Sequence, residues 1–126
     1  MNASSATSEI TSVINAYFDA LYYCDTDIIS TVFHPRAIYA TADESPPLIR
    51  TMEEYLSVIA QRKSPASKNE PRHDHIDHIE LAGKNTAFVR VRCVIKPRNF
   101  VDLLTLIRTD NKWQIIAKAF HFVETH

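Results

Sequence analysis

Glycine is almost absent from this sequence, and its scarcity excludes several kinds of ligand site. Gly83 is the single glycine among 126 residues. Phosphate-binding loops and dinucleotide-binding turns need several glycines, because the backbone approaches the phosphates closely only where there is no Cβ. The sequence therefore predicts no nucleotide held in this manner, and we expect no cofactor.

Cysteine is scarce as well. Cys24 falls in a helical pattern and Cys93 in a strand pattern. Two such residues fit ordinary buried thiols better than a disulfide framework or a zinc site. We expect both to be free.

A dominant charge and a long apolar run are also missing. The chain has 14 Lys and Arg against 15 Asp and Glu, so it lacks the basic surface of a polyanion-binding protein. No apolar run approaches the ~20 residues that span a bilayer. The polar start, residues 1–8, lacks the regions of a secretory signal. We expect a cytoplasmic protein without a nucleic-acid or membrane partner.

The remaining composition is that of a globular protein, and its first half is helical. Apolar residues make up 45% and charged residues 23%, which is typical of one soluble domain over residues 1–126. Apolar residues recur at steps of three and four in three segments. Their boundary signals are a cap at Ser8 for a helix over 9–23, a cap at Asp25 and a stop at Pro35 for a second helix, and a capping box of Thr51 with Glu54 for a third. A short strand is predicted over 37–41, a loop over 42–50 and a mobile connection or lid over 62–71.

Beyond Pro71 the apolar period changes from 3.6 to 2, which is typical of strands. Candidate strands lie at about 72–82, 85–95, 99–109 and 112–123. Connections this short join only antiparallel neighbours, so these strands form a meander. The sequence predicts an α+β fold in which three N-terminal helices pack on a curved, mainly antiparallel sheet.

Both faces of the last two predicted strands are apolar. In the first of them, one face carries Phe100, Asp102, Leu104 and Leu106, and the other carries Val101, Leu103, Thr105 and Ile107. Helices cover only one face of such a sheet, so something else covers the other. The simplest cover is a second copy, which predicts a homodimer through the outer face of the sheet. The alternative is a sheet rolled tightly enough to shield itself.

Asp102 is the residue least suited to its apolar surroundings, because burying an unpaired carboxylate costs several kcal/mol. A three-residue turn at 109–111 places Asp102 opposite Lys118, whereas a two-residue turn places it opposite Ala119. The first register pairs the charges and is physically preferred. Tyr17 lies on the apolar stripe of the first helix, and its hydroxyl also needs a hydrogen bond if it is buried.

Several short motifs follow the order helix, helix, short strand, helix, meander. They are Tyr17-Phe18, Leu21 with Asp25, Phe33-His34-Pro35 before Ala37, Phe100-Val101-Asp102-Leu103-Leu104, Lys112-Trp113-Gln114-Ile115, Lys118 and Phe120. Together they resemble the nuclear transport factor 2 superfamily, most of all its branch of putative lumazine-binding proteins. The resemblance implies a cone-shaped, cystatin-like α+β fold with an internal pocket. Ketosteroid isomerases, scytalone dehydratase and polyketide cyclases share that fold.

The resemblance to ketosteroid isomerase implies roles for Tyr17 and Asp102. In that enzyme a tyrosine and a protonated aspartic acid hold the substrate carbonyl. Lys118 departs from that pattern and favours an ionised Asp102. The alternative is a purely structural network of Tyr17, Asp102 and Lys118.

The aspartate base of ketosteroid isomerase corresponds to about Thr41, where no base stands. Asp43 and His34 are the remaining candidates for moving a proton. His34 also lies where it can interact with the end of the second helix instead. His121, near the end of the last strand, is a weaker candidate for a pocket mouth or a dimer edge.

His73, His75 and Asp77 share one face of a predicted strand, a spacing that can supply metal ligands. The same pattern describes a solvated sheet edge, and we expect no metal.

These observations predict a pocket protein for a small apolar or aromatic ligand. The residues expected to contact that ligand are Phe33, Phe100, Leu104, Ile116, Lys118 and Phe120. Three functions stay open: an isomerase, dehydratase or cyclase acting on a carbonyl compound, a non-catalytic dimeric binder of an aromatic or pterin-like ligand, and a protein-interaction module.

Overall fold

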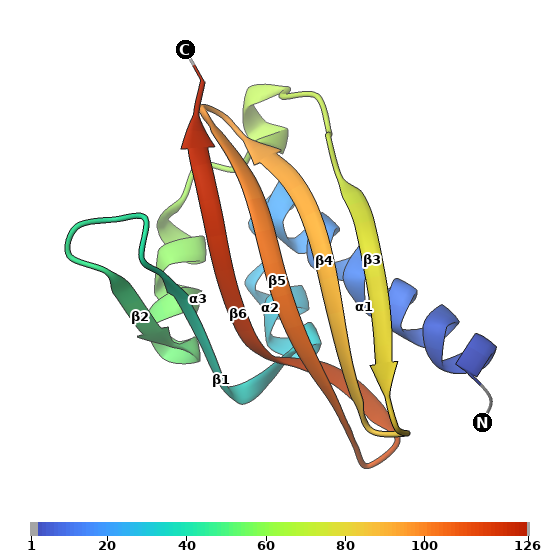
Figure 1. The fold of residues 1–126 in the computed structure, drawn as a ribbon. Helices are drawn as coiled ribbons and strands as arrows, with labels where there is room; N and C mark the ends of the chain where they lie inside the picture. Colours follow the sequence, from blue (N-terminus) through green and yellow to red (C-terminus); the bar gives the residue numbers. More distant parts are fainter. Residues whose placement is uncertain (1–2, 126) are drawn as a thin grey trace.

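The computed structural model describes residues 3–125, with the side chains of residues 3 and 4 left out. Its helices and strands follow one another as shown in Figure 1. They are α1 (Ala3–Tyr23), α2 (Thr26–Val32), β1 (Phe33–Thr41), β2 (Leu48–Thr51), α3 (Met52–Gln61), the 3₁₀ turn η1 (Ala66–Lys68), β3 (His75–Ala82), β4 (Thr86–Ile95), β5 (Arg98–Thr109) and β6 (Lys112–Glu124). None of the helices within the described range has the length and apolar character needed to cross a membrane.

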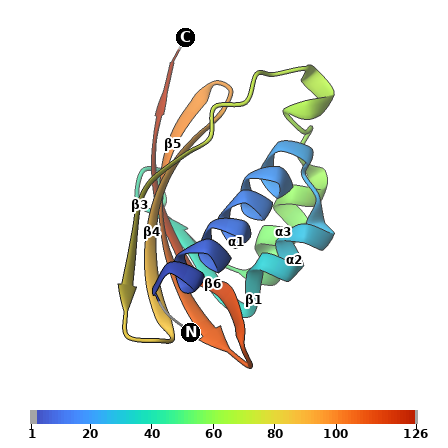
Figure 2. The ribbon, with the colours of Figure 1, turned by 90° about the vertical axis from the view of Figure 1, so that its right-hand side faces the viewer.

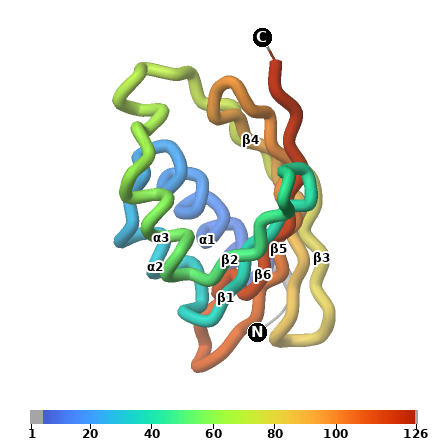
Figure 3. The backbone as a smooth tube through the Cα atoms, turned by 90° about the vertical axis from the view of Figure 1, so that its left-hand side faces the viewer, coloured from blue at the N-terminus to red at the C-terminus, as the bar shows by residue number. Residues whose placement is uncertain are grey.

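The described residues form two layers. One sheet has the order β2-β1-β6-β5-β4-β3, and every neighbouring pair is antiparallel except β1 with β6. The three α-helices of residues 3–125 lie on one face of this curved sheet, and the other face carries no helix (Figures 2 and 3). The prediction of an α+β fold with a curved, mainly antiparallel sheet is confirmed.

The helices are close to the prediction, with differences at their ends. α1 begins at Ala3, so Ser8 lies inside the helix and does not cap it. Buried Ala6 extends the apolar stripe one turn before Ile10, which explains the earlier start. α2 is capped by Asp25 as predicted, but it ends at Val32, three residues before Pro35. The capping box that opens α3 is confirmed.

Two segments next to the predicted loop are strands. β1 begins at Phe33, four residues earlier than predicted, and β2 falls partly inside the segment expected to be loop. β2 has only four residues and pairs with β1 alone, and it follows Pro46 and Pro47 directly. This edge strand was predicted as loop because Pro46 and Pro47 are strong loop signals.

The turn between β5 and β6 contains two residues rather than three. Asp110 and Asn111 both have positive φ, 51° and 61°, as a two-residue hairpin turn of the mirror-image type requires. The preferred three-residue register was therefore wrong. A register shift opposite Thr105 and Leu106 then leaves Ile116 as an extra residue in β6.

This β-bulge decides which side chains of β6 face the helices. Trp113 and Ile115 are buried before the bulge, and Lys118 is buried after it. Asp102 consequently lies opposite Phe120, and Leu104 lies opposite Lys118. All four side chains share the inner face, because residues directly opposite one another point to the same side of a sheet.

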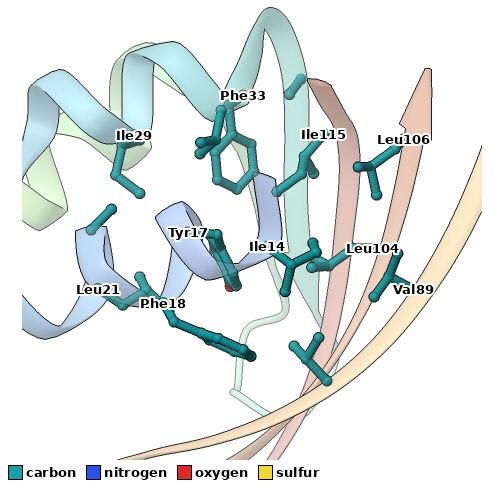
Figure 4. Close-up of a cluster of buried hydrophobic side chains, with 14 of the residues drawn as sticks. Ile14, Tyr17, Phe18, Leu21, Ile29, Phe33, Val89, Leu104, Leu106 and Ile115 are labelled. Atoms are coloured by element: carbon teal, nitrogen blue, oxygen red, sulfur yellow. The ribbon is translucent and has the colours of Figure 1, made fainter. Parts of the chain in front are cut away.

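The core fills the space between the helices and the inner face of the sheet (Figure 4). Tyr17 lies at its centre, between Phe18 and Phe33, and its ring contacts both of theirs. Both cysteines are free; Cys93 is buried and Cys24 is partly buried.

The outer face of the sheet is apolar in part, as predicted. Ile38, Ile49, Leu103 and Val123 are large apolar side chains that are more than a third exposed. Strand pairing and alternation place all four on the face opposite the helices.

Candidate functional site

Four side chains form a buried polar cluster between α1, α3 and the inner face of β5 and β6. The Tyr17 hydroxyl donates to Asp102 Oδ2 at 2.6 Å, and Lys118 Nζ lies 3.7 Å from the same oxygen. Lys118 Nζ also donates to the Tyr55 hydroxyl oxygen at 3.2 Å. Asp102 is 1% exposed and Lys118 7% exposed. The sequence predicted contacts among Tyr17, Asp102 and Lys118, and the structure contains them.

The charges in this cluster are balanced inside an apolar shell. The Lys118 ammonium lies 5.2 Å from the ring centroids of Tyr17, Tyr55 and Phe120, within range of cation–π attraction. Burial is the largest single effect and lowers the pKa of Lys118, but Asp102, Tyr55 and Cys93 together outweigh burial and raise that pKa above its usual 10.5. Lys118 is therefore a charged donor at neutral pH.

Tyr17 is held as a hydrogen-bond donor. Burial first, and the charge of Asp102 second, raise the pKa of Tyr17 well above its ordinary value. Burial also raises the pKa of the Cys93 thiol, which stands beside the cluster and stays neutral. The cluster thus holds one ammonium, one carboxylate and neutral partners.

A small hollow lies next to the cluster. Its volume is about 30 Å³, which is room for about one water molecule. Asp102 Oδ1 is buried beside it and has no hydrogen-bond partner among the described residues. The side chains around the hollow come from α1, β1, α3 and the sheet: Leu21, Tyr39, Tyr55, Arg62, Cys93, Ile95, Phe100, Asp102, Lys118 and Phe120.

Residues 62–74, which include the lid predicted over 62–71, arch from α3 to β3 (Figure 2), and Arg62 of this segment lines the hollow. Glu70 fastens the lid at two points. Its carbonyl oxygen accepts a hydrogen bond of 2.7 Å from the Tyr22 hydroxyl, and its Oε1 accepts one of 3.1 Å from the backbone of Lys96. Arg72 adds an ion pair of 2.8 Å with Asp19 of α1. These contacts tie the segment to α1 and to the turn between β4 and β5.

Three of the predicted ligand contacts line the hollow, namely Phe100, Lys118 and Phe120. Phe33 and Leu104 are fully buried behind the cluster, where Phe33 packs edge-on against Tyr17 and Tyr55. The prediction that Ile116 contacts the ligand is corrected. It is the extra residue of the bulge, it is partly exposed, and it lies outside the lining of the hollow.

The two groups predicted to move a proton do not reach the cluster. Asp43 is exposed, and its Oδ2 bonds to His121 Nδ1 and to the backbone of Phe122. His34 accepts a hydrogen bond at Nδ1 from the backbone of Arg36 and is absent from the lining of the hollow. Thr41 is buried near the hollow, but it carries no base. Both assignments are therefore corrected.

His73, His75 and Asp77 have a spacing that can supply metal ligands, but they do not form a group of three ligands in the structure. Asp77 instead bonds to Arg92 Nε through both carboxylate oxygens, at 3.0 and 2.9 Å. Nowhere along residues 3–125 do three His, Cys, Asp or Glu side chains come close enough to hold a metal ion.

Tyr55 and Arg62 are site residues that sequence reasoning missed. Tyr55 lies on the apolar stripe of α3, and its hydroxyl needs a hydrogen-bond partner on burial, as that of Tyr17 does. That signal was present in the sequence. Arg62 comes from the lid, and no local pattern of residues indicates where a lid closes.

Comparisons with known proteins agree with this architecture. Residues 5–121 match the sequence model of the family described as "Putative lumazine-binding". The chain belongs to this family. No match was found among curated proteins.

Solved structures similar to this member of the putative lumazine-binding family have the nuclear transport factor 2-like (NTF2-like) fold. An NTF2-like protein of unknown function from Shewanella baltica OS155 is 19% identical, with a TM-score of 0.87 over 99% of both chains. Another, from Silicibacter pomeroyi DSS-3, is 16% identical, with a TM-score of 0.83 over 98% of this chain and 100% of that one. A ketosteroid isomerase-like protein from Erwinia carotovora atroseptica SCRI1043 is 14% identical, with a TM-score of 0.73 over 94% and 96%. These similarities show the fold alone.

In this family member, the cluster provides two neighbouring groups of opposite hydrogen-bonding character. Asp102 Oδ1 is an acceptor without a partner among the described residues, and the Lys118 ammonium has three donor hydrogens. The arrangement can hold a ligand that offers a donor beside an acceptor.

Proposed function

We propose that this domain binds a small planar ligand, without catalysis, through an edge that carries an N–H group beside a carbonyl. The observation that supports this most strongly is the buried Asp102 Oδ1, which lacks a hydrogen-bond partner among the described residues and lies next to the Lys118 ammonium. An unpaired buried acceptor costs ~1–3 kcal/mol, so a ligand donor that satisfies it gains affinity.

The chemistry of the edge follows from the two groups. A ligand N–H would donate to Asp102 Oδ1, and the adjacent carbonyl oxygen would accept from Lys118 Nζ. Cyclic amides and imides have this arrangement, and so do pterins and pteridine-2,4-diones such as lumazine. The family description supports the same class of ligand.

The walls of the hollow suit a flat ring. Tyr39 and Phe120 are stacked with an interplanar angle of 17°, and Phe100 lies 5.8 Å from Phe120. Aromatic walls with a few convergent polar groups are typical of small-molecule sites. We propose that the ligand ring inserts among these three side chains.

Ligand entry requires an opening. A hollow of about 30 Å³ is far smaller than a bicyclic ring, and sites for such ligands usually measure about 300 Å³ or more. Phe100, Phe120 and Arg62 are only partly buried and border the hollow. We propose that these side chains move together with the lid, so the apparent affinity equals the intrinsic affinity multiplied by the fraction of the open form.

Calorimetric titration with lumazine and with 1,3-dimethyllumazine tests this proposal. The two rings have nearly the same shape, but methylation replaces both N–H groups. We expect lumazine to bind at least about tenfold more tightly, because the dimethyl compound leaves Asp102 Oδ1 unpaired. Equal affinities, or no binding of lumazine, would contradict the proposal.

The outer face supports a second proposal, a homodimer. Ile38, Ile49 and Leu103 leave an apolar surface on the face without helices, and a second copy would bury it. Light scattering after size-exclusion chromatography is expected to give twice the monomer mass for the wild-type chain. Leu103→Glu is expected to give a monomer with an unchanged circular dichroism spectrum. A wild-type monomer would contradict the dimer.

A further inference from the structure

The outer face of the sheet also carries an open groove that the proposed function does not use. Its volume is about 790 Å³, compared with about 30 Å³ for the inner hollow. It lies over β3, β4, β5 and β6 near the Lys96–Pro97 turn. The most exposed apolar residue of the proposed dimer surface, Ile49, lies at the opposite edge of the sheet, on β2.

Strand register brings cationic side chains together across this groove. His75 lies opposite Arg92, Arg92 opposite Val101, and Val101 opposite His121, so the four residues form one row across four strands. All four line the groove, as do His73 and Lys96. Two basic side chains directly opposite one another favour an anion placed between them.

Acidic side chains are absent from the lining of the groove within residues 3–125, although two stand just outside it. Asp77 bonds to Arg92 through Nε only, so the bonds leave the two terminal guanidinium nitrogens unused. Asp43 bonds to Nδ1 of His121, and Nε2 is the ring nitrogen left for another partner. Asp77 thus orients Arg92 and leaves two of its donor nitrogens for a ligand.

The floor of the groove is apolar. Val94 and Val123 lie on either side of Asn99 in the next row of the sheet, and Val101 lies in the row described above. A groove with apolar walls and a few converging donors, in this range of volume, is typical of a site for a small organic ligand. The donors here are almost all cationic or protonatable, which selects an anion.

We propose that the groove binds an organic carboxylate with an apolar body. The carboxylate lies between Arg92 and His75, and the apolar body lies on Val101, Val94 and Val123. Phe100 and Cys93 line both the groove and the inner hollow, but Arg92 and His75, which would hold the carboxylate, line the groove alone, so either site can fail without the other.

The probes for the test are 2-naphthoate and its neutral analogue 2-naphthamide, titrated into the wild-type chain at pH 7 and followed by amide chemical shifts. We expect 2-naphthoate to move the resonances of Val94, Val101 and Val123, and to bind at least about tenfold more tightly than the amide. Equal binding of the two probes, or shifts confined to other residues, would overturn the proposal.

Arg92→Gln and Arg90→Gln form a matched pair of variants. Both arginines are on β4, both are exposed, and both lie near Asp77, but Arg90 is outside the groove lining. Arg92→Gln is expected to weaken 2-naphthoate binding by about tenfold, and Arg90→Gln by less than about twofold. If both variants weaken binding equally, the effect is general surface charge and the proposed site does not exist.

Discussion

The two faces of the sheet hold similar pairs of charged residues in opposite environments: Asp102 of β5 with Lys118 of β6 on the inner face, and Asp77 of β3 with Arg92 of β4 on the outer face. On the inner face, Asp102 and Lys118 are buried with side-chain exposures of 1% and 7%. On the outer face, Asp77 and Arg92 are exposed by 23% and 53%. Water screens the outer pair, and a missing partner there is replaced by solvent. Breaking the inner pair strands a charge in an apolar shell, so burial rather than geometry determines the energetic importance of each pair.

The largest predicted effect is that of Lys118→Met. The variant leaves the Asp102 carboxylate buried without its cation, and we expect the free energy of unfolding to fall by ~3–5 kcal/mol. Urea denaturation followed by circular dichroism measures this value. Adding Asp102→Leu to Lys118→Met should recover part of the loss, since it removes the stranded charge. If Asp102→Leu lowers the free energy of unfolding by the same amount in the Lys118→Met variant as in the wild type, the two residues are uncoupled.

Alkaline titration breaks the same pair more gradually. The pKa of Lys118 is raised in the folded state, so its contribution is complete below its unfolded pKa near 10.5 and is lost as pH rises through the folded pKa. The pKa values of Tyr17 and Tyr55 are raised too, mainly by burial, and act in the same direction. We expect the free energy of unfolding to decrease above about pH 10, and to decrease less steeply in the double variant Asp102→Leu/Lys118→Met. If the free energy of unfolding decreases equally with pH in the wild type and the double variant, the loss in alkali does not come from the Asp102–Lys118 pair.

Tyr17→Phe has a smaller expected effect. It removes one hydrogen bond to a charged acceptor, which is worth ~1.5–3 kcal/mol, and retains the ring packing. Tyr22→Phe is the control, because it removes a hydrogen bond to a neutral carbonyl oxygen, worth ~0.5–1.5 kcal/mol. Thermal unfolding measures both. A larger loss from Tyr22→Phe would reverse the predicted order.

The smallest expected effect belongs to the outer face. Asp77→Asn should leave the melting temperature near neutral pH within error of the wild type, because both partners are exposed. Arg92 first, and Arg90 less strongly, hold the pKa of Asp77 below its usual range, so any contribution of this pair is present near neutral pH and is lost as pH falls through the depressed pKa. The outer pairs therefore weaken in acid, whereas the inner cluster weakens in alkali. A clear drop in the melting temperature of Asp77→Asn at pH 7 would contradict the small effect predicted for this exposed pair.

The fold was largely predictable, because it depends on patterns that reach only a few residues along the chain. The capping box at Thr51 and Glu54 and the cap at Asp25 both formed as predicted. The meander followed from the change of period after Pro71. β2 was missed because its four residues stand next to two prolines and gain their hydrogen bonds only from β1.

The site was predictable in part. Asp102, Tyr17 and Lys118 were found from one argument, that a polar group among apolar neighbours needs a partner. The register that was expected to join Asp102 to Lys118 was wrong, and they meet diagonally because the bulge at Ile116 turns Lys118 inward. Asp43 and His34 were misplaced because loop conformation and the start of β1 decide their direction, and the sequence carries no local signal for either.

The proposed function places the planar ligand at the inner cluster rather than in the outer groove, and nuclear magnetic resonance of the labelled chain distinguishes these two locations. On addition of lumazine, we predict shifts of the side-chain carboxyl carbon of Asp102 and the ammonium nitrogen of Lys118, with the imidazole signals of His75 and His121 unmoved. Shifts of the two histidines without any change at Asp102 would contradict the account.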